Sequence, residues 1–443
     1  MTHSKSKIQN PKFSLPRYPR YKDSGVEWLG EVPEHWDVQS LRAVAGLYVE
    51  KNQPDLPVLS VYREYGVILK DSRDDNHNAT SLDTSNYKVV RPGDLAVNKM
   101  KAWQGSLGVS EHHGIVSPAY ITCRLNQEKV AGRYIHYLLR SKSLIGALDS
   151  ISYGVRVGQW DMRFEDFKKV GITIPPKPEQ NRIVAFLDQK TLEIDTLIAK
   201  KQRQIELLDE QKAILINRAV TRGLNPKAKL KPSGIEWIGD IPAHWEVKRI
   251  GHLGTVGNGS TPSRSNSRYW DRADYPWLNS GSVNQGIITE ADQFVSNLAL
   301  KECHLPLVKE ESIVIAITGQ GKTRGTAALL TIPATINQHL AYIEIHTAAA
   351  LPKFIHLALT SQYLQLRAIS ESGSTKGALT CQDVKEFKIV LPPVGEQEAI
   401  ISAANRIRED LDLLAKQFDS QIVSLKCLRS TLIAHAVTGK IKV

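Results

Sequence analysis

Cysteine is scarce in this chain, with four residues in 443 and no Cys-x-x-Cys pair. This scarcity excludes a disulfide framework, argues against a structural zinc site and indicates a reducing compartment. Long apolar runs are also missing, so no segment is expected to cross a bilayer as a helix. The first residues, 1–13, lack the apolar core of a secretory signal peptide. We therefore expect a cytoplasmic protein with no membrane segment and no bound metal.

Positive and negative charges balance over most of the chain, although the formal net charge is +11. The excess comes mainly from residues 1–22, residues 223–232 and two lysines near the C-terminus, whereas 23–178 and 233–395 each balance their charges. A basic protein favours nucleic acid as a partner, but this distribution excludes a positive field over a whole domain. A DNA-binding face must therefore be a local patch. The basic tails would add salt-dependent phosphate attraction, or solubility alone.

A repeat is the strongest feature that is present. Residues 24–36, Ser-Gly-Val-Glu-Trp-Leu-Gly-Glu-Val-Pro-Glu-His-Trp, return at 233–245 as Ser-Gly-Ile-Glu-Trp-Ile-Gly-Asp-Ile-Pro-Ala-His-Trp. A second motif, Pro-Pro-x-x-Glu-Gln, occupies 175–180 and 392–397. Each half is too long for a solenoid unit, so the repeat predicts a duplicated globular module followed by a long helix. The sequences of the two halves are similar at their ends and different in their middles. This pattern suits a common framework that carries two independent recognition surfaces.

Two long helices are predicted at 179–222 and 396–439, which align without a gap. Apolar residues recur there at steps of three, four and seven, the pattern of one helix face. A helix of this length is roughly 65 Å long and cannot bury its stripe inside a small domain. An antiparallel pair formed by the two repeats is the economical solution and would relate the modules by a pseudo-twofold axis. The predicted stripe comprises Ile183, Leu187, Ile194, Leu197, Ile205, Leu208, Leu215, Ile400, Leu411, Leu414, Ile422, Leu425 and Leu432.

The modules are predicted to be α/β (α+β), with strand signals around a short amphipathic helix at 133–139 and 353–359. Each module ends in a predicted strand, 170–174 or 387–391, that enters the double proline. The fold class is thus two α/β modules in pseudo-twofold repeat, separated by an antiparallel coiled coil. The expected boundaries are a basic tail at 1–22, modules at 23–178 and 233–395, helical spacers at 179–222 and 396–443, and a linker at 223–232.

Polar loops that differ between the modules carry side chains of the kinds that contact DNA. Arg and Lys pair with guanine, Asn and Gln with adenine, and Ser, Thr and Lys also hold phosphates. Because surface loops are generally rich in such residues, an ordinary solvated loop is the alternative at any one position. The candidate DNA contacts are Arg73, Asn76, Asn98, Lys99, Lys101, Gln104, Tyr153, Arg156 and Gln159 in the first module, and Ser260, Thr261, Arg264, Asn279, Ser280, Gln320, Lys322, Arg324, Thr375 and Lys376 in the second.

Two patterns raise the question of catalysis by the chain itself. Residues 316–323, Ala-Ile-Thr-Gly-Gln-Gly-Lys-Thr, fit a relaxed phosphate loop. A true phosphate loop runs into a helix, whereas Arg-Gly-Thr-Ala and then Pro333 follow here, so a DNA-facing loop is favoured. An adenine methyltransferase needs an Asn/Asp-Pro-Pro-Tyr/Phe motif to hold the flipped base, and Asn10-Pro11-Lys12-Phe13 lacks the second proline. We expect no catalytic residue in this chain.

Histidine and tryptophan recur at equivalent places of the two halves. His35 matches His244, and His136 matches His356. None has a second His or Cys at ligand spacing, which favours capping or packing over metal binding. The repeated tryptophans are expected to form the hydrophobic anchor that opens each module: Trp28, Trp36, Trp237 and Trp245.

Together, the two repeated motifs and the long helix after each resemble the specificity subunit of type I restriction–modification systems. In the second module, Gly259-Ser260-Thr261-Pro262, Tyr269-Trp270 and Pro276-Trp277 resemble a common form of that family's target recognition domain. The resemblance covers nearly the whole chain. It marks the two modules as target recognition domains 1 and 2.

The resemblance implies a non-catalytic DNA-binding subunit that recognises a bipartite, asymmetric target, one half-site per recognition domain. The coiled coil would set the spacer and dock two methyltransferase (modification) subunits, which methylate adenine N6 with S-adenosylmethionine. Separate restriction/translocase subunits, where present, would use ATP and Mg, so this chain itself would bind no cofactor. The alternatives are a nuclease or ATPase with a duplicated DNA-binding region, and a scaffold that binds only protein. ATP turnover by the purified chain would favour the nuclease or ATPase. Lack of sequence-specific DNA retention would favour the protein-only scaffold.

Overall fold

Two compact units make up the computed structural model, which describes residues 16–73, 80–154, 160–319, 321–372 and 377–443. Unit 1 consists of Met1–Gln202 with Asp419–Val443, and unit 2 of Arg203–Phe418. Each unit holds one module, the first half of the long helix that follows it and the last half of the other long helix. Over the described ranges, no helix is long and apolar enough to cross a membrane.

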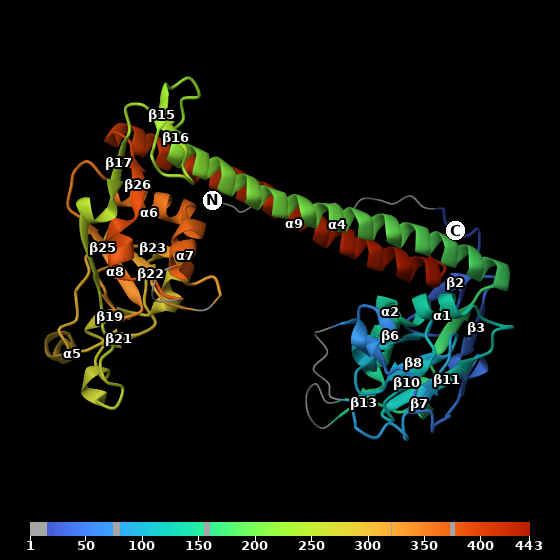
Figure 1. Cartoon of the computed structure of the whole chain (residues 1–443). Coiled ribbons are helices and arrows are strands. Elements are labelled where there is room, and N and C mark those ends of the chain that lie inside the picture. The colour runs from blue at the N-terminus through green and yellow to red at the C-terminus, as the bar shows by residue number, and fades with distance from the viewer. Residues whose placement is uncertain (1–15, 74–79, 155–159, 320, 373–376) are drawn as a thin grey trace, which may run out of the picture. The chain divides into compact units, whose positions relative to one another are not determined.

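The first module is built on a four-stranded antiparallel sheet in the order β4-β11-β8-β9. The central strand β8 is buried on both faces, as its apolar sequence requires, and its neighbour β11 is buried except at Arg124 and partly at Tyr120. Two short helices lie between this sheet and the long helices (Figure 1). The bounds are β4 Ala45–Leu47, β8 Leu95–Asn98, β9 Leu107–Val109, β11 Tyr120–Leu125, α1 Gly132–Leu139 and α2 Lys142–Ser150.

Pairs of antiparallel strands surround that sheet. β3 pairs with β14, which brings the start and the end of the module side by side. A short helix, α3 (Phe164–Phe167), precedes β14. The pairs are β1 (Tyr21–Asp23) with β2 (Glu31–Pro33), β3 (Asp37–Ser40) with β14 (Gly171–Ile174), β5 (Leu59–Tyr62) with β6 (Gly66–Leu69), β7 (Lys88–Val90) with β10 (Gly114–Val116), and β12 (Ser152–Tyr153) with β13 (Asp161–Met162).

The second module has a five-stranded sheet in the order β18-β25-β22-β23-β20, of which only the β23–β20 pair is parallel. Ile313 and Ile315 of β22 pack into the core cluster that holds Phe354 of α6, whereas Val314 packs into the opposite cluster. The strand therefore needs apolar side chains at every position. The bounds are β18 Gly254–Asn258, β20 Ile287–Ile288, β22 Ile313–Ala316, β23 Ala327–Leu330, β25 Leu340–Ile345, α6 Pro352–Ser361, α7 Tyr363–Ser372 and α8 Cys381–Glu386.

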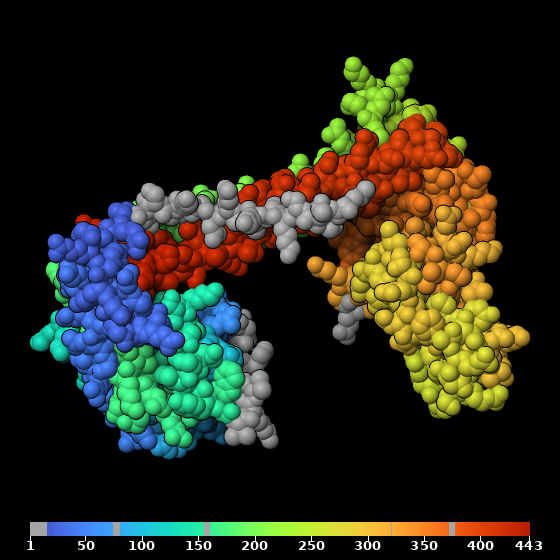
Figure 2. All heavy atoms as spheres, turned by 180° about the vertical axis from the view of Figure 1, so that it is seen from behind, coloured from blue at the N-terminus to red at the C-terminus, as the bar shows by residue number. Residues whose placement is uncertain are grey.

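A small sheet lies at the end of the second module that is remote from the long helices, where it forms the yellow lobe in Figure 2. Its strands are β21 (Phe294–Val295), β19 (Tyr275–Leu278) and β24 (Thr335–Ile336), and α5 (Asn297–Glu302) lies beside it. At the other end, β15 (Leu230–Pro232) pairs with β16 (Asp240–Pro242), and β17 (Glu246–Arg249) with β26 (Lys388–Leu391). β1 thus begins inside the predicted tail, 1–22, and β15 lies inside the predicted linker, 223–232.

The long helices are α4, Lys177–Arg222, and α9, Val394–Val437, each beginning two residues earlier than expected. In unit 1 the start of α4 lies antiparallel to the end of α9, and Arg429 Nε is 3.0 Å from Asp195. In unit 2 the end of α4 lies antiparallel to the start of α9, and Lys212 Nζ is 2.8 Å from Asp412. The predicted fold class, two α/β modules with paired antiparallel helices, is confirmed.

One member of the predicted apolar stripe is wrong. Leu197 is 46% exposed, and Ile198 is buried in its place. Buried positions on α4 follow alternating steps of four and three from Leu187 through Thr191 and Ile194 to Ile198, the 3.5-residue period of a coiled-coil seam. The other members divide between buried (Ile183, Leu187, Ile194, Ile400, Ile422 and Leu432) and half-buried (Ile205, Leu208, Leu215, Leu411, Leu414 and Leu425).

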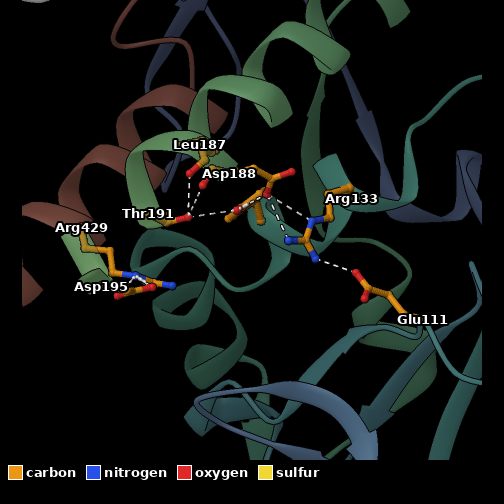
Figure 3. A network of polar contacts seen from close by, with 8 residues as sticks. Glu111, Arg133, Leu187, Asp188, Thr191, Asp195 and Arg429 are labelled. Atoms are coloured by element: carbon orange, nitrogen blue, oxygen red, sulfur yellow. Dashed lines mark hydrogen bonds and ion pairs between the residues drawn. The ribbon is translucent and has the colours of Figure 1, made fainter. Parts of the chain in front are cut away.

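A polar network fastens α1 to α4 in unit 1 (Figure 3). Arg133 of α1 contacts Asp188 of α4 at 3.1 Å and Glu111 at 2.7 Å. The hydroxyl of Tyr137 donates to the same oxygen of Asp188. Thr191 lies one turn further along α4 and donates to the carbonyl of Leu187 at 2.7 Å. One carboxylate thus ties the short helix of the module to the long helix.

Candidate nucleic-acid interface

The two repeated motifs meet in unit 1 and hold the first module on its helix. Glu179, in the first turn of α4, accepts hydrogen bonds from His35 Nε2 at 2.9 Å, Trp36 Nε1 at 3.2 Å and the hydroxyl of Tyr18. Burial raises the pKa of a carboxyl, but these three donors outweigh it and hold the pKa of Glu179 below its usual value. The His-Trp and Glu-Gln motifs are therefore the two sides of one contact.

The same contact recurs in unit 2. Glu396, at the start of α9, accepts from His244 Nε2 at 2.6 Å and from Trp245 Nε1 at 3.0 Å. Neighbouring Gln397 bonds the backbone ahead of α6, as Gln180 bonds the backbone ahead of α1. The second motif therefore also fixes the short helix of each module.

Only half of the predicted tryptophan anchor is correct. Trp36 and Trp245 are fully buried. Trp28 is half-buried and Trp237 is 44% exposed. The second tryptophan of each motif lies inside because its indole N–H donates a hydrogen bond to the motif glutamate, Glu179 or Glu396.

In the first module, the loop after β8 is held against β13. Lys99 Nζ lies 3.2 Å from Asp161, and the amide of Met162 donates to the Lys99 carbonyl at 3.0 Å. The rings of Trp103 and Trp160 lie 4.6 Å apart. These contacts give one surface made of two segments far apart in sequence, with aromatic faces and a lysine close together.

The remaining first-module candidates vary in exposure. The guanidinium of Arg73 lies 4.7 Å from the ring centroid of Tyr65 and 5.8 Å from that of Tyr62. Lys101 and Tyr153 are exposed. Two more, Asn98 and Gln104, are half-buried, and the amide of Met100 donates to Asn98 Oδ1.

In the second module, Arg264 is held in place by two tryptophans. Its guanidinium lies 3.6 Å from the ring centroid of Trp270 and 5.2 Å from that of Trp277. The indole N–H groups of these rings bond the carbonyls of Ser263 and Ser260, at 3.2 and 3.3 Å. The loop is thus held at two points just before Arg264, and an ordered guanidinium loses less entropy on binding a base edge or phosphate.

Other second-module candidates already have protein partners. Asn279 caps the short 3-10 helix Ser280–Gln285, in which Ser280 is half-buried. Arg324 has only 14% of its side chain exposed and contacts Glu371 and the carbonyl of Gly377. These bonds indicate a structural role for Arg324. Lys322 is exposed.

Sequence reasoning missed residues that lie around these loops. Thr261 donates to Gln338, and Thr318 lies 2.7 Å from His339 Nδ1. Gln338 and His339 precede β25 and carry no motif, so only the sheet brings them to Thr261. Trp160, Asp161 and Gln293 were missed for the same reason. Six candidates lie outside the described residues: Asn76, Arg156, Gln159, Gln320, Thr375 and Lys376.

The phosphate-loop pattern runs from Gly321 into the strand β23 rather than a helix, so it lacks the helix N-terminus that holds phosphate. Within the described ranges, no group of three or more His, Cys, Asp or Glu side chains could hold a metal ion. His136 and His356 are largely buried in α1 and α6, and burial lowers the pKa of each to about 4.

Comparison with known proteins gives one consistent result. The family model of the type I restriction modification DNA specificity domain matches residues 64–207 and 242–419. The chain is 23% identical over 429 residues to the type I restriction enzyme MjaIX specificity subunit of Methanocaldococcus jannaschii, covering 94% of this chain and 95% of that protein. It is 21% identical to the EcoR124I/EcoR124II specificity subunit of Escherichia coli, covering 66% and 70%.

Two solved structures share the fold. One is a chain from a structure described as the basis of complex assembly and conformational transition of the type I R-M system. It matches with a TM-score of 0.64 at 17% identity, covering 92% of this chain and 98% of the other. The HsdS subunit from Thermoanaerobacter tengcongensis matches with a TM-score of 0.55 at 17% identity and the same coverage.

Proposed function

The chain belongs to the family of type I restriction–modification specificity subunits, and we propose that its two modules read the two halves of one bipartite, asymmetric DNA target. Each module would contact one half-site through its loops. Arg264 with its tryptophans would act in the second module, and Lys99, Lys101 and Gln104 in the first. Because both modules balance their charges, base and phosphate contacts must come from such local groups rather than from a general positive field.

One observation carries this proposal: identical frames support different loops. The His-Trp–Glu contact is the same in both units, whereas Lys99 is positioned by Asp161 and Arg264 by Trp270. A duplicated frame with divergent loops is what two separate reading surfaces require. The two half-sites should therefore differ in sequence.

The paired helices are proposed to set the spacing between half-sites and to dock two modification subunits. Those subunits would bind S-adenosylmethionine and methylate adenine N6, and restriction/translocase subunits, where present, would use ATP and Mg. The chain itself would be non-catalytic and would bind no cofactor. An ATPase is disfavoured because the best nucleotide-binding pattern runs into a strand, and a nuclease or a protein-only scaffold is left as the alternative to be tested.

A genome-wide map of N6-methyladenine tests this function. The chain would be expressed with its cognate modification subunit in a methylation-free host, with the modification subunit alone as the control. We expect a split, asymmetric methylated motif only when this chain is present. A soluble complex that produces no motif would refute the proposal.

The same map can assign half-sites to modules. A first-module variant, Lys99→Ala with Lys101→Ala and Gln104→Ala, should alter one half of the motif. A second-module variant, Arg264→Ala, should alter the other half. Loss of both halves in either variant would contradict independent reading by the two modules.

A further inference from the structure

The two units differ at the contact that they otherwise share. In unit 1, Tyr18 covers the motif: its hydroxyl donates to Glu179, and its ring centroid lies 5.6 Å from that of His35 and 5.8 Å from that of Trp36. Tyr18 is buried, and burial together with the bond to Glu179 raises its pKa. As a result, the Glu179 side chain is only 7% exposed.

In unit 2 the equivalent carboxylate is open. The side chain of Glu396 is 44% exposed, and within the part of the chain that the structure describes it receives hydrogen bonds from His244 and Trp245 but no third one. A pocket of about 230 Å³ lies against it, lined by His244, Pro242 and Ile400, by Arg222 at the end of α4, and by Asn225 and Ala228 of the segment that follows. Its apolar wall and single carboxylate match an aromatic ring that carries a hydroxyl donor.

The strand pairing identifies which residue stands where Tyr18 does. Tyr21 pairs with Pro33 in β1–β2, and Leu230 pairs with Pro242 in β15–β16. The next backbone bond is also repeated, from Glu34 to Arg20 and from Ala243 to Lys229. Counting back three residues from the start of each first strand gives Tyr18 in unit 1 and Lys227 in unit 2.

Lys227 does not fill the pocket. It is exposed, and it is not among the residues that line the cavity. The side chains of His244 and Glu396 are 53% and 44% exposed, so the pocket is open to the protein surface. Among the described residues, the chain therefore supplies a tyrosine at this place in unit 1 and no side chain that fills the matching place in unit 2.

We propose that the Glu396–His244 pocket is a docking site for a tyrosine side chain of a partner protein. The partner would place its phenol ring against Pro242 and Ile400 and donate its hydroxyl to Glu396, as Tyr18 does to Glu179. The pocket and its chemistry follow from the internal repeat. Only the identity of the partner, a modification subunit, rests on the function proposed above.

The chemistry of the pocket is tested with a small probe on the full chain. Saturation-transfer NMR would compare N-acetyl-tyrosinamide with N-acetyl-phenylalaninamide. Lys227→Tyr supplies the tyrosine in cis and should abolish transfer to the tyrosine amide. Lys229→Tyr, two residues along the same segment, is the matched control and should leave transfer intact. Equal transfer to both amides, transfer that survives Lys227→Tyr, or no transfer to the wild type would each overturn the pocket's assignment.

The partner is tested by measuring the affinity of the full chain for the modification subunit. Lys227→Tyr should weaken binding about tenfold, the loss expected when one buried aromatic anchor is excluded. Lys229→Tyr should bind like the wild type, and thermal unfolding should show that both variants are folded. Unchanged binding by Lys227→Tyr would overturn the docking role alone. A wild-type chain that binds no modification subunit would overturn both the partner's identity and the proposed function.

Discussion

At the scale of single residues, a buried glutamate and two buried histidines link the fold to pH. Glu179 keeps a pKa below its usual value because three donors surround it. His136 and His356 keep a pKa of about 4, first because they are buried and then because cationic arginines lie near them. The close approach of Gly66, whose backbone has φ +74°, leaves no room between the strand and the His136 ring. Because the pKa of each of these groups is lower in the folded than in the unfolded chain, the free energy of unfolding should fall as the pH falls.

We expect Glu179→Gln to lower the free energy of unfolding at pH 7 by about 1–3 kcal/mol, because a charged acceptor of buried donors is lost. The folded-state pKa lies below the unfolded one, so the contribution of Glu179 is present above about pH 4 and is lost as the pH falls below that. The variant should therefore show a shallower loss of stability between pH 5 and pH 2. Urea unfolding across this range, with exposed Glu398→Gln as the control, measures it. An unchanged pH slope would contradict the assignment.

We expect the paired variant His136→Gln with His356→Gln to lose less stability than the wild type on acidification. Each histidine has a folded pKa below its unfolded value of about 6.5, so the unfolded chain takes up protons first as the pH falls. The stability that the neutral rings contribute is therefore lost between about pH 6.5 and pH 4. Urea titrations at pH 7, 6 and 5 would show it. Exposed His252→Gln is the control and should follow the wild type.

At the scale of elements, the modules are fastened to their helices by different means. In unit 1, Arg133 and Tyr137 of α1 bond Asp188 of α4 (Figure 3). In unit 2, the aligned positions of α6 and α9 hold Lys353, Leu357 and Asn405, which cannot form that network. The repeat thus preserves the Glu-Gln contact and lets the second fastening vary.

We expect Asp188→Ala to destabilise unit 1 by about 1–3 kcal/mol, because a charged acceptor shared by two donors is removed. Hydrogen exchange of the α1 amides should quicken accordingly, while that of α6 stays the same. The aligned variant Asn405→Ala is the matched control and should leave both helices protected. If the two variants behave alike, the network does not hold α1 on α4.

At the scale of the whole molecule, the pseudo-twofold repeat is visible in single ion pairs. Asp195 with Arg429 in unit 1 and Lys212 with Asp412 in unit 2 occupy positions that the repeat exchanges, with the acidic residue on the opposite helix. A seam of alternating three- and four-residue steps accompanies them. Both features fix which residues of α4 and α9 face each other. The length of the paired helices is thereby defined, which the proposed role as a spacer between half-sites requires.

We expect insertion of one heptad into both helices, after Arg203 and after Ser420, to lengthen the spacer in the methylated motif. Seven residues keep the 3.5-residue seam in register and add about 10 Å, or about three base pairs at 3.4 Å each. The methylation map described above measures the spacer, and the two half-site sequences are its internal control. A changed half-site, or an unchanged spacer in a folded variant, would refute the ruler.

The sequence by itself determined the repeat, the two long helices and the strand that closes each module, because these follow from periodicity and from motifs whose residues are close together in the chain. It also identified the histidines, tryptophans and glutamates of the frame. It could not show that His35 and Glu179 form one contact, or that Gln338 lies beside Thr261, because those pairs are distant in sequence. Tertiary structure alone decided that Ile198 rather than Leu197 lies in the seam. It also decided that Arg324 is largely buried and that no described residue takes the place of Tyr18 in unit 2. In each case the outcome depends on which side chain is buried against a segment distant in sequence, and the local sequence pattern does not specify that segment.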